Sequence, residues 1–321
     1  MSKPYIIVTL GPTGSGKTKL VEEVIKYLNL EPDYKKFIVD DLIENNESYK
    51  QKVLSIIRNV DLKCKREGKH CEDINCNSCN TRPYYLNPEH ELLTDFNKAY
   101  FDTKASKYCV PGIPLNCNQI IDNRLAETIS KRENIIIEAT GFYVPNWIIS
   151  GIPFLHDNIS ELSYISNENP YNVIFAYSTV PFVELIKRNL NRTITSIESF
   201  TNDNTLSAPR LPDISIKNFV KKIKLIIKTL LSIYRNCIKA TNEEICGTQR
   251  IDNLLIFDNS GINMKLVFDS NINKMTESRF RDLLNELFKL QHPVKAGNKK
   301  SRKKLFNSKQ KRKISKKYRM D

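Results

Sequence analysis

The segment from Gly11 to Thr18 reads Gly-Pro-Thr-Gly-Ser-Gly-Lys-Thr and directly follows the apolar run Tyr5–Leu10. Glycines let a backbone wrap closely around phosphate oxygens and turn its N–H groups inward. The pattern therefore predicts a strand, a phosphate-binding loop and a helix over Lys17–Leu28, whose N-terminal dipole adds positive charge. We expect Lys17 to reach the β- and γ-phosphates of ATP and the Thr18 hydroxyl to hold Mg²⁺. The expected nucleotide-binding residues are Gly11, Pro12, Thr13, Gly14, Ser15, Gly16, Lys17 and Thr18.

Short apolar runs alternate with amphipathic segments along the rest of the chain. Such alternation indicates a mainly parallel sheet covered on both faces by helices, a three-layer α/β fold of the P-loop NTPase or kinase type. Residues 42–133 interrupt the pattern as a polar, cysteine-rich insertion, which we expect to contain helices and irregular chain. Further strands are predicted over 36–41, 134–138, 172–177, 254–258 and 265–268, helices over 181–192, 214–239 and 277–290, and a polar loop over 193–213.

The positive charge of the chain is concentrated at its C-terminal end. The formal net charge is +14, and residues 295–321 contribute +12 of it. This tail has almost no apolar residues, so its composition predicts disorder. We therefore divide the chain into a kinase-like domain over 1–294 and a basic tail over 295–321. The tail is read as a nuclear localisation signal, a non-specific contact to nucleic acid or a solubilising extension.

The chain has no apolar run of about 18 residues and no signal-peptide pattern at its start. No membrane contact is expected, and the expected location is intracellular, cytoplasmic or nuclear. In that compartment the eight cysteines are expected to be thiols or metal ligands before disulfides.

The cysteines of the insertion have spacings that could hold Zn²⁺. Cys76 and Cys79 form a C-x-x-C pair, the usual chelating turn for this metal. Cys64, with Cys71 or His70, could complete four ligands. The alternatives are a redox disulfide or inert thiols. Cys109 and Cys117 flank a Pro-Gly-Ile-Pro turn and could join the same site.

The residues after the loop narrow the class of P-loop protein. A GTPase would need an Asn-Lys-x-Asp run to read guanine, and a helicase motor would need a second RecA-like lobe; neither is present. Carboxylates instead end two predicted strands, Asp40 and Asp41 the strand over 36–41 and Glu138 the strand over 134–138. Ligands of open parallel sheets bind beyond the carboxyl ends of the strands, so these side chains are expected beside the loop. The competing interpretation of the acidic pair is a helix cap.

Arginines follow the fourth strand, where a phosphotransferase needs cations. Arg188 and Arg192 are spaced i, i+4 and therefore share a helix face, and Arg210 lies in the polar loop. Phosphoryl transfer depends on positioning and charge neutralisation, which such side chains supply. A solvated helix face is the alternative for Arg188 and Arg192.

Taken in order, these motifs resemble the zeta-toxin-like P-loop kinases, over roughly residues 5–260. That family has a Gly-rich loop, a strand ending in Asp, and an apolar strand running into Glu-x-Thr and Val-Pro, which matches the segment from Ile136 to Pro145. The resemblance implies that Asp40 or Asp41 is the base, with Asp41 favoured. It also implies that Arg192 (or Arg188) and Arg210 bind phosphate. The family's Asp-x-Asp is here Asp40-Asp41-Leu42.

The sequence thus predicts an ATP- and Mg²⁺-dependent kinase that transfers a γ-phosphoryl group to a hydroxyl of a small molecule, nucleotide or nucleotide sugar. Glu138 is expected to position that hydroxyl. The alternative is a nucleic-acid-associated ATP-binding protein, or a polynucleotide 5′-hydroxyl kinase, that docks through the basic tail.

Overall fold

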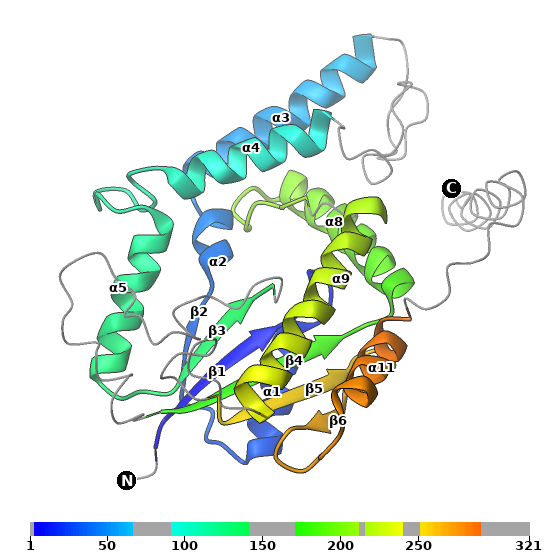
Figure 1. Cartoon of the computed structure of the whole chain (residues 1–321). Helices are drawn as coiled ribbons and strands as arrows, with labels where there is room; N and C mark the ends of the chain where they lie inside the picture. Colours follow the sequence, from blue (N-terminus) through cyan, green and yellow to red (C-terminus); the bar gives the residue numbers. More distant parts are fainter. Residues whose placement is uncertain (1–2, 67–90, 141–170, 212–215, 240–250, 290–321) are drawn as a thin grey trace, which may run out of the picture. The chain divides into compact units, whose positions relative to one another are not determined.

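A six-stranded sheet forms the centre of the computed structural model, which describes residues 3–66, 91–140, 171–211, 216–239 and 251–289. The strand order is β2-β3-β1-β4-β5-β6, and every pair is parallel except β5 with β6 (Figure 1). This confirms the predicted α/β fold with a mainly parallel sheet. The strands are β1 (Tyr5–Leu10), β2 (Lys35–Phe37), β3 (Ile135–Ala139), β4 (Asn172–Thr179), β5 (Asn253–Asp258) and β6 (Lys265–Asp269).

The central strands are apolar on both faces because helices cover both faces. Alternate residues point to opposite sides of a sheet, so Ile174 packs with the buried face of α1 (Lys17–Leu28). Tyr177 points the other way and meets the ring of Phe288, at 6.2 Å between centroids. Phe288 ends α11 (Glu277–Phe288), which packs beside α9 (Ile216–Ile233) and its π-helical continuation η4 (Tyr234–Lys239).

The helix after β4 is longer than the sequence predicts. We expected a helix over 181–192 followed by a polar loop over 193–213, but α8 spans Phe182–Asn202. Its buried face continues at i, i+4 spacing through Leu185, Asn189, Thr193 and Ile197. Two of these four buried residues, Asn189 and Thr193, are polar, and a hydrophobic pattern therefore does not reveal that the helix continues to Asn202.

The second strand is shorter than expected and its carboxylates belong to a helix. The strand predicted over 36–41 ends at Phe37, the last residue of β2 that pairs with β3. Asp40 and Asp41 lie in the first turn of α2 (Val39–Glu44), where the helix dipole favours acidic side chains. The N-cap residue is Ile38 and no side chain makes a capping hydrogen bond, so the pair begins a helix without capping it.

The predicted insertion contains helices, as expected, and these share one core. They are α3 (Glu47–Arg66), α4 (Glu91–Ala105) and α5 (Cys117–Ser130), which follow α2 in the chain. Tyr49, Phe96 and Ile120 are buried together with Phe200 from the end of α8. The insertion is thus packed onto the rest of the fold through α8.

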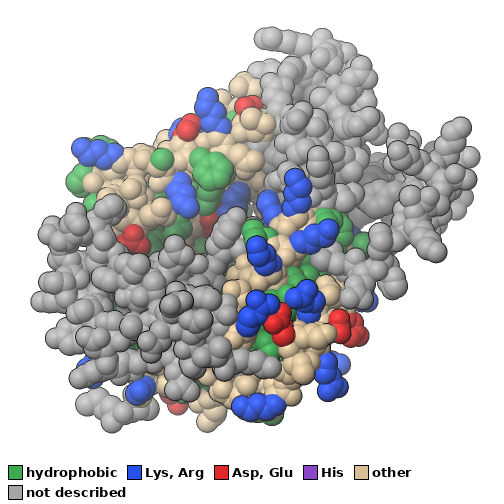
Figure 2. Space-filling model, in the orientation of Figure 1, with side chains coloured by type: hydrophobic (Ala, Val, Ile, Leu, Met, Phe, Trp, Pro, Cys, Tyr) green, Lys and Arg blue, Asp and Glu red, His purple; other side chains and the backbone are tan. Residues whose placement is uncertain are grey.

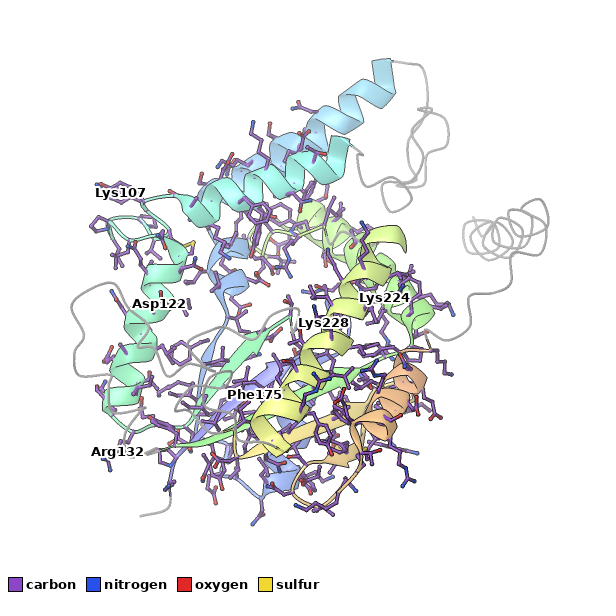
Figure 3. All side chains as sticks on the ribbon, in the orientation of Figure 1. Lys107, Asp122, Arg132, Phe175, Lys224 and Lys228 are labelled. Atoms are coloured by element: carbon purple, nitrogen blue, oxygen red, sulfur yellow. A yellow bond between two sulfur atoms is a disulfide. The ribbon has the colours of Figure 1, made fainter. Side chains whose placement is uncertain are left out.

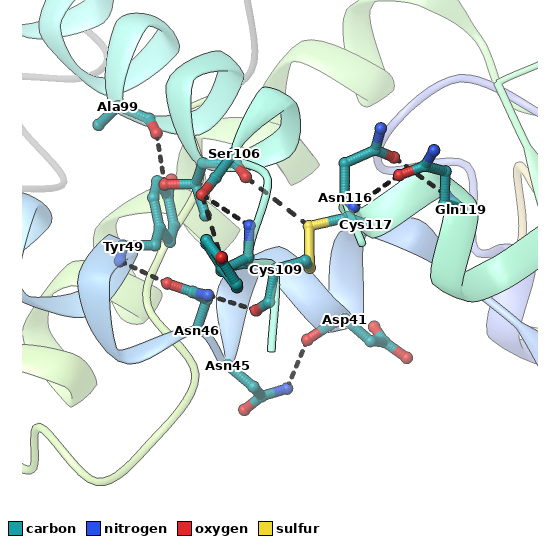
Figure 4. Close-up of a disulfide and its surroundings, with 12 residues drawn as sticks. Asp41, Asn45, Asn46, Tyr49, Ala99, Ser106, Cys109, Asn116, Cys117 and Gln119 are labelled. Atoms are coloured by element: carbon teal, nitrogen blue, oxygen red, sulfur yellow. Dashed lines mark hydrogen bonds between the residues drawn. A yellow bond between two sulfur atoms is a disulfide. The ribbon is translucent and has the colours of Figure 1, made fainter. Parts of the chain in front are cut away.

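Cys109 and Cys117 form a disulfide, with Cα atoms 5.0 Å apart (Figure 4). The expectations that these cysteines are thiols, or that they join a zinc site, are therefore wrong. The turn between them folds back through a bridge from Val110 to Ile113, which brings the two ends together. Asn46, just after α2, donates its side-chain N–H to the Cys109 carbonyl at 2.6 Å.

The other expected zinc ligands lie outside what the structure describes. Cys71, Cys76 and Cys79 fall in 67–90, and the Cys64 side chain is likewise undescribed. Among the described residues, no group of three or more His, Cys, Asp or Glu side chains could hold a metal ion. The zinc prediction thus finds no support.

The structure also bears on the division of the chain and on membrane spans. The chain divides into units over Met1–Phe288 and Lys289–Asp321, and the basic tail lies outside the described residues. None of the described helices has both the length and the apolar character needed to span a membrane.

Candidate functional site

The loop after β1 has the backbone of a phosphate cradle. Gly14 and Gly16 adopt φ values of 83° and 84°, in the left-handed region that favours glycine. Gly16 is the residue that precedes the first turn of α1, so the loop N–H groups and the helix N-terminus converge. The Thr18 hydroxyl is exposed in that first turn.

Side chains from distant segments hold this loop in place. The amide of Asn189, on α8, donates to the Thr13 carbonyl at 2.7 Å. The amide of Asn259, just after β5, and the hydroxyl of Ser178, on β4, donate to the Ser15 carbonyl at 2.8 and 2.7 Å. The loop is therefore preorganised by hydrogen bonds from three parts of the fold.

These clamps also explain why the loop positions must be glycine. A Cβ atom at Gly14 would lie 2.6 Å from the Asn189 amide nitrogen, and one at Gly16 would overlap the Asn259 amide. The side chains that fix the loop thus occupy the space that any larger residue would need.

The register of the sheet brings Glu138 to Lys17. Thr9 on β1 pairs with Glu138 on β3, two residues before the loop begins. The Lys17 Nζ atom lies 3.4 Å from the Glu138 carboxylate and donates to the Gly11 carbonyl at 3.1 Å. Lys36 contacts the other Glu138 oxygen at 3.8 Å. Burial lowers the pKa of Lys17, and Glu138 partly offsets this shift.

Two side chains, those of Arg210 and Tyr100, hold the carboxylate of Asp40. Arg210 Nη1 lies 2.5 Å from its carboxylate, and the Tyr100 hydroxyl donates to the other oxygen. The Arg210 guanidinium also lies 5.4 Å from the centre of the Tyr100 ring, within cation–π range. Burial and the neighbouring Asp40 charge raise the pKa of Tyr100, which keeps its hydroxyl a donor.

Asp41 differs from Asp40 in its surroundings. Its side chain is exposed, and no hydrogen bond or ion pair to its carboxylate is found among the described residues. Partial burial nevertheless raises its pKa, while the nearby Lys36 opposes the shift. Glu138 and Arg192 are also close enough to affect this carboxyl electrostatically. Asp41 is thus the less constrained of the two candidate bases.

Glu44 lies one helical turn beyond Asp40 and contributes a third carboxylate. It is 4.0 Å from Arg210 Nε, and its side chain is only 16% exposed. Burial raises the pKa of Glu44 to about 7, and Arg210 opposes the rise. This carboxyl group therefore changes charge near neutral pH.

The segment that carries Arg210 is fastened to the first helices of the insertion. The Ala208 N–H donates to the Glu44 carbonyl at 2.8 Å, and the Tyr49 hydroxyl donates to the Pro209 carbonyl at 3.0 Å. Lys50 reaches the Thr205 carbonyl at 3.1 Å. The position of Arg210 is thereby fixed by contacts to Thr205, Ala208 and Pro209, which precede it in the chain.

A cavity of about 110 Å³ lies between the loop, α2, α8 and the segment before Arg210. Arg192, Arg210 and Glu44 face this cavity, together with several hydroxyl groups. Its lining residues are Thr13, Glu44, Arg192, Thr193, Ser196, Ser207, Ala208, Pro209 and Arg210. The cavity therefore presents two guanidinium groups, one carboxyl group and several hydroxyls.

The two arginines of α8 have different surroundings. Arg192 is exposed and lines the cavity. Arg188 bonds to Glu184 on its own helix at 3.3 Å and donates to the Asn259 carbonyl at 2.9 Å. Arg188 thus supports a residue that clamps the loop, whereas Arg192 points to where a ligand could lie.

Sequence reasoning missed Tyr100, Glu44, Asn189 and Asn259. The spacing of four between Asp40 and Glu44 would have indicated Glu44 if this segment had been predicted as a helix rather than a strand. Asn259 follows a predicted strand, in a position where ligand-binding residues gather. Nothing in the sequence singles out Tyr100 or Asn189, because both depend on how helices pack.

No family model matches the chain, and no curated protein matches it. A chain of the PezAT chromosomal toxin–antitoxin system of Streptococcus pneumoniae is 12% identical, with a TM-score of 0.46, over 92% of this chain and 82% of that one. Deoxyadenosine kinase from M. mycoides, solved with bound dATP, is 14% identical, with a TM-score of 0.28, over 88% and 98%. Likenesses this distant carry no argument about activity, which has to come from the site itself.

The phosphate cradle can be tested with two alanine variants that strain the backbone alike. Gly16 and Gly112 have φ values of 84° and 79°, but a Cβ at Gly112 would meet nothing within 4 Å. We expect Gly16→Ala to lower ATP affinity at least tenfold and Gly112→Ala to leave it unchanged. Calorimetric titration with ATP measures the affinity, and urea unfolding checks that both variants fold. Equal affinities in the two variants would contradict the clamp by Asn259.

Glu44 predicts a pH dependence of stability. Its folded pKa of about 7 exceeds the ordinary value of 4.5, so the folded state binds the additional proton between these pH values. The unfolding free energy contributed by Glu44 therefore falls as pH rises from 4.5 to 7. Relative to wild type, Glu44→Gln should gain up to about 3 kcal/mol between pH 4.5 and 8.

Urea unfolding at several pH values measures this difference. Glu198→Gln, which removes an exposed carboxylate from α8, is the matched control. A difference between Glu44→Gln and wild type that stays constant with pH would show that Glu44 is not the group responsible.

Proposed function

We propose that this chain is an ATP- and Mg²⁺-dependent kinase that transfers the γ-phosphoryl group to a hydroxyl of a small molecule, nucleotide or nucleotide sugar. One observation carries the proposal most directly. The cavity that begins at Thr13 of the phosphate loop is lined by Arg192 and Arg210 and has acidic side chains of α2 at its edge. Cations beside the loop and nearby carboxylates are what phosphoryl transfer requires.

The chain's own residues fit a nucleoside triphosphate. The glycine-rich loop, with Gly14 and Gly16 in the left-handed region just before α1, is the kind of backbone that wraps around phosphate oxygens. Lys17 is largely buried and paired with Glu138. When a nucleotide binds, the Lys17 ammonium group would contact the β- and γ-phosphate oxygens in place of part of its contact with Glu138. The exposed Thr18 hydroxyl would hold Mg²⁺, which neutralises developing charge on those oxygens.

The chemistry then needs a proton acceptor and charge stabilisation. Asp41 would take the proton of the acceptor hydroxyl. The oxygen of that hydroxyl would bond to the γ-phosphorus while the bond from the γ-phosphorus to the β-phosphate oxygen breaks, which releases ADP. Arg192 and Arg210 would stabilise the charge on the transferring group. A carboxylate with a raised pKa and no fixed partner is better suited to accept a proton than Asp40, which is held by Arg210 and Tyr100.

A finer assignment, to the zeta-toxin-like kinases, rests on the order of motifs. Glu138-Ala139-Thr140 ends β3 with the expected Glu-x-Thr, and the continuation towards Pro145 lies outside the described residues. Under this assignment Glu138 positions the acceptor hydroxyl. The polynucleotide 5′-hydroxyl kinase alternative depends on the basic tail, which also lies outside the described residues.

The acceptor can be found with γ-labelled ATP and a panel of nucleotide sugars, nucleosides, nucleotides and 5′-hydroxyl oligonucleotides. We expect one class to gain the label, and Lys17→Ala to abolish transfer while remaining folded. Thermal unfolding of the variant provides the folding check. Absence of transfer to every class, or unchanged transfer by Lys17→Ala, would contradict the kinase proposal.

The two candidate bases can be separated by amide substitution once an acceptor is known. Asp41→Asn should lower kcat by about 10² to 10⁴ because a general base contributes that much. Asp40→Asn should instead act through Arg210, mainly by raising KM for ATP. Asp102→Asn, which changes an exposed carboxylate on α4, is the control for charge. A larger loss of kcat in Asp40→Asn than in Asp41→Asn would move the base to Asp40.

A further inference from the structure

Helix α9 has an unusual distribution of charge. Its 18 residues include five lysines and no acidic residue. One face of the helix packs against the body, with Phe219, Ile223, Ile226 and Leu230 all buried. The lysines are therefore confined to the remaining face, and no carboxylate of the same helix neutralises them.

Three of these lysines form an exposed row, which we name the α9 lysine row: Lys221, Lys224 and Lys228. They are spaced i, i+3 and i+7, so they project from one side at axial steps of about 4.5 and 6 Å. None of the three makes a hydrogen bond or ion pair within the described part of the chain. Lys and Arg side chains gather over this region in Figure 2, and Lys224 and Lys228 are labelled in Figure 3.

We propose that the α9 lysine row binds the phosphate backbone of a nucleic acid. Unneutralised ammonium groups in a row match a row of phosphates by charge alone, and releasing condensed counterions supplies the free energy. The site is separate from the phosphate loop, and the proposal holds whichever acceptor the proposed kinase uses.

The exposed side of α9 lacks what other anionic partners need. A membrane-bound helix inserts an apolar face, but the apolar face of α9 is buried in the protein. A protein partner usually finds aromatic or aliphatic anchors at the centre of its interface. The exposed large hydrophobic side chains of the described residues lie elsewhere: Tyr27, Phe101, Tyr108, Ile113, Val183, Leu206, Ile262 and Ile272.

The same face predicts binding without sequence preference. Lysines contact phosphates as point charges, whereas base recognition uses Arg, Asn, Gln or stacked aromatic rings.

The salt dependence of DNA binding tests the proposal in the full-length chain. We would titrate a fluorescein-labelled 20-base-pair duplex of arbitrary sequence at several NaCl concentrations. Each lost phosphate contact lowers the slope of log K against log salt by about 0.9. Replacement of Lys221, Lys224 and Lys228 by Gln should therefore reduce the slope by about 2 to 3, with equal affinity for two unrelated sequences.

A matched triple variant controls for net charge. Lys26, Lys265 and Lys274 are exposed lysines on other elements, and their replacement by Gln removes the same total charge. We expect the control to keep the wild-type slope, with urea unfolding confirming that both variants fold. An unchanged slope in the α9 variant would assign all binding to other basic regions and overturn the proposal. So would an equal fall in both variants, or a loss confined to binding of phosphatidylserine vesicles.

Discussion

The parallel pairing of β1 with β3 is the constraint from which the candidate site follows. It sets Glu138 opposite Thr9, two residues before the glycine loop, and so delivers a carboxylate to Lys17 from a distant part of the chain. The pairing of β1 with β4 and of β4 with β5 likewise positions the residues that hold the loop. These strands lead into the segments that carry Asn189 and Asn259, whose amides hold the loop carbonyls.

The segment between β2 and β3 proves to be part of the site rather than an appendage. Tyr100, on α4, contacts both Asp40 and Arg210, and Tyr49, on α3, fastens the segment that carries Arg210. The disulfide between Cys109 and Cys117 adjoins Asn46, directly after the helix of the acidic residues. Packing of the insertion therefore determines where the arginine and its carboxylate partner lie.

The glycine turn between β1 and α1, the central strands and the position of Glu138 near the end of β3 were predictable because each shows in a short run of residues. A glycine pattern behind an apolar strand, or a glutamate that ends a wholly apolar strand, is local information. The length of α8 was not predictable, since Asn189 and Thr193 are buried for reasons of packing and look exposed by type. The disulfide was missed because compartment and spacing favoured thiols, while its two halves meet only when the turn at Val110 and Ile113 closes. The proposed roles of Asp41, Arg192 and Arg210 stay predictions.

The rim of the loop carries as many acids as bases among the described residues. Asp40, Asp41, Glu44 and Glu138 face Lys17, Lys36, Arg192 and Arg210, several of them already in contact. Such a self-compensated rim projects little field into solvent and would not draw a polyanion from afar. A ligand there has to be recognised at short range. One of its oxygens replaces a carboxylate as the partner of a lysine or arginine side chain. Long-range attraction of polyanions would thus come from the lysine-rich surfaces of the chain, and selectivity among ligands from the paired charges around the loop.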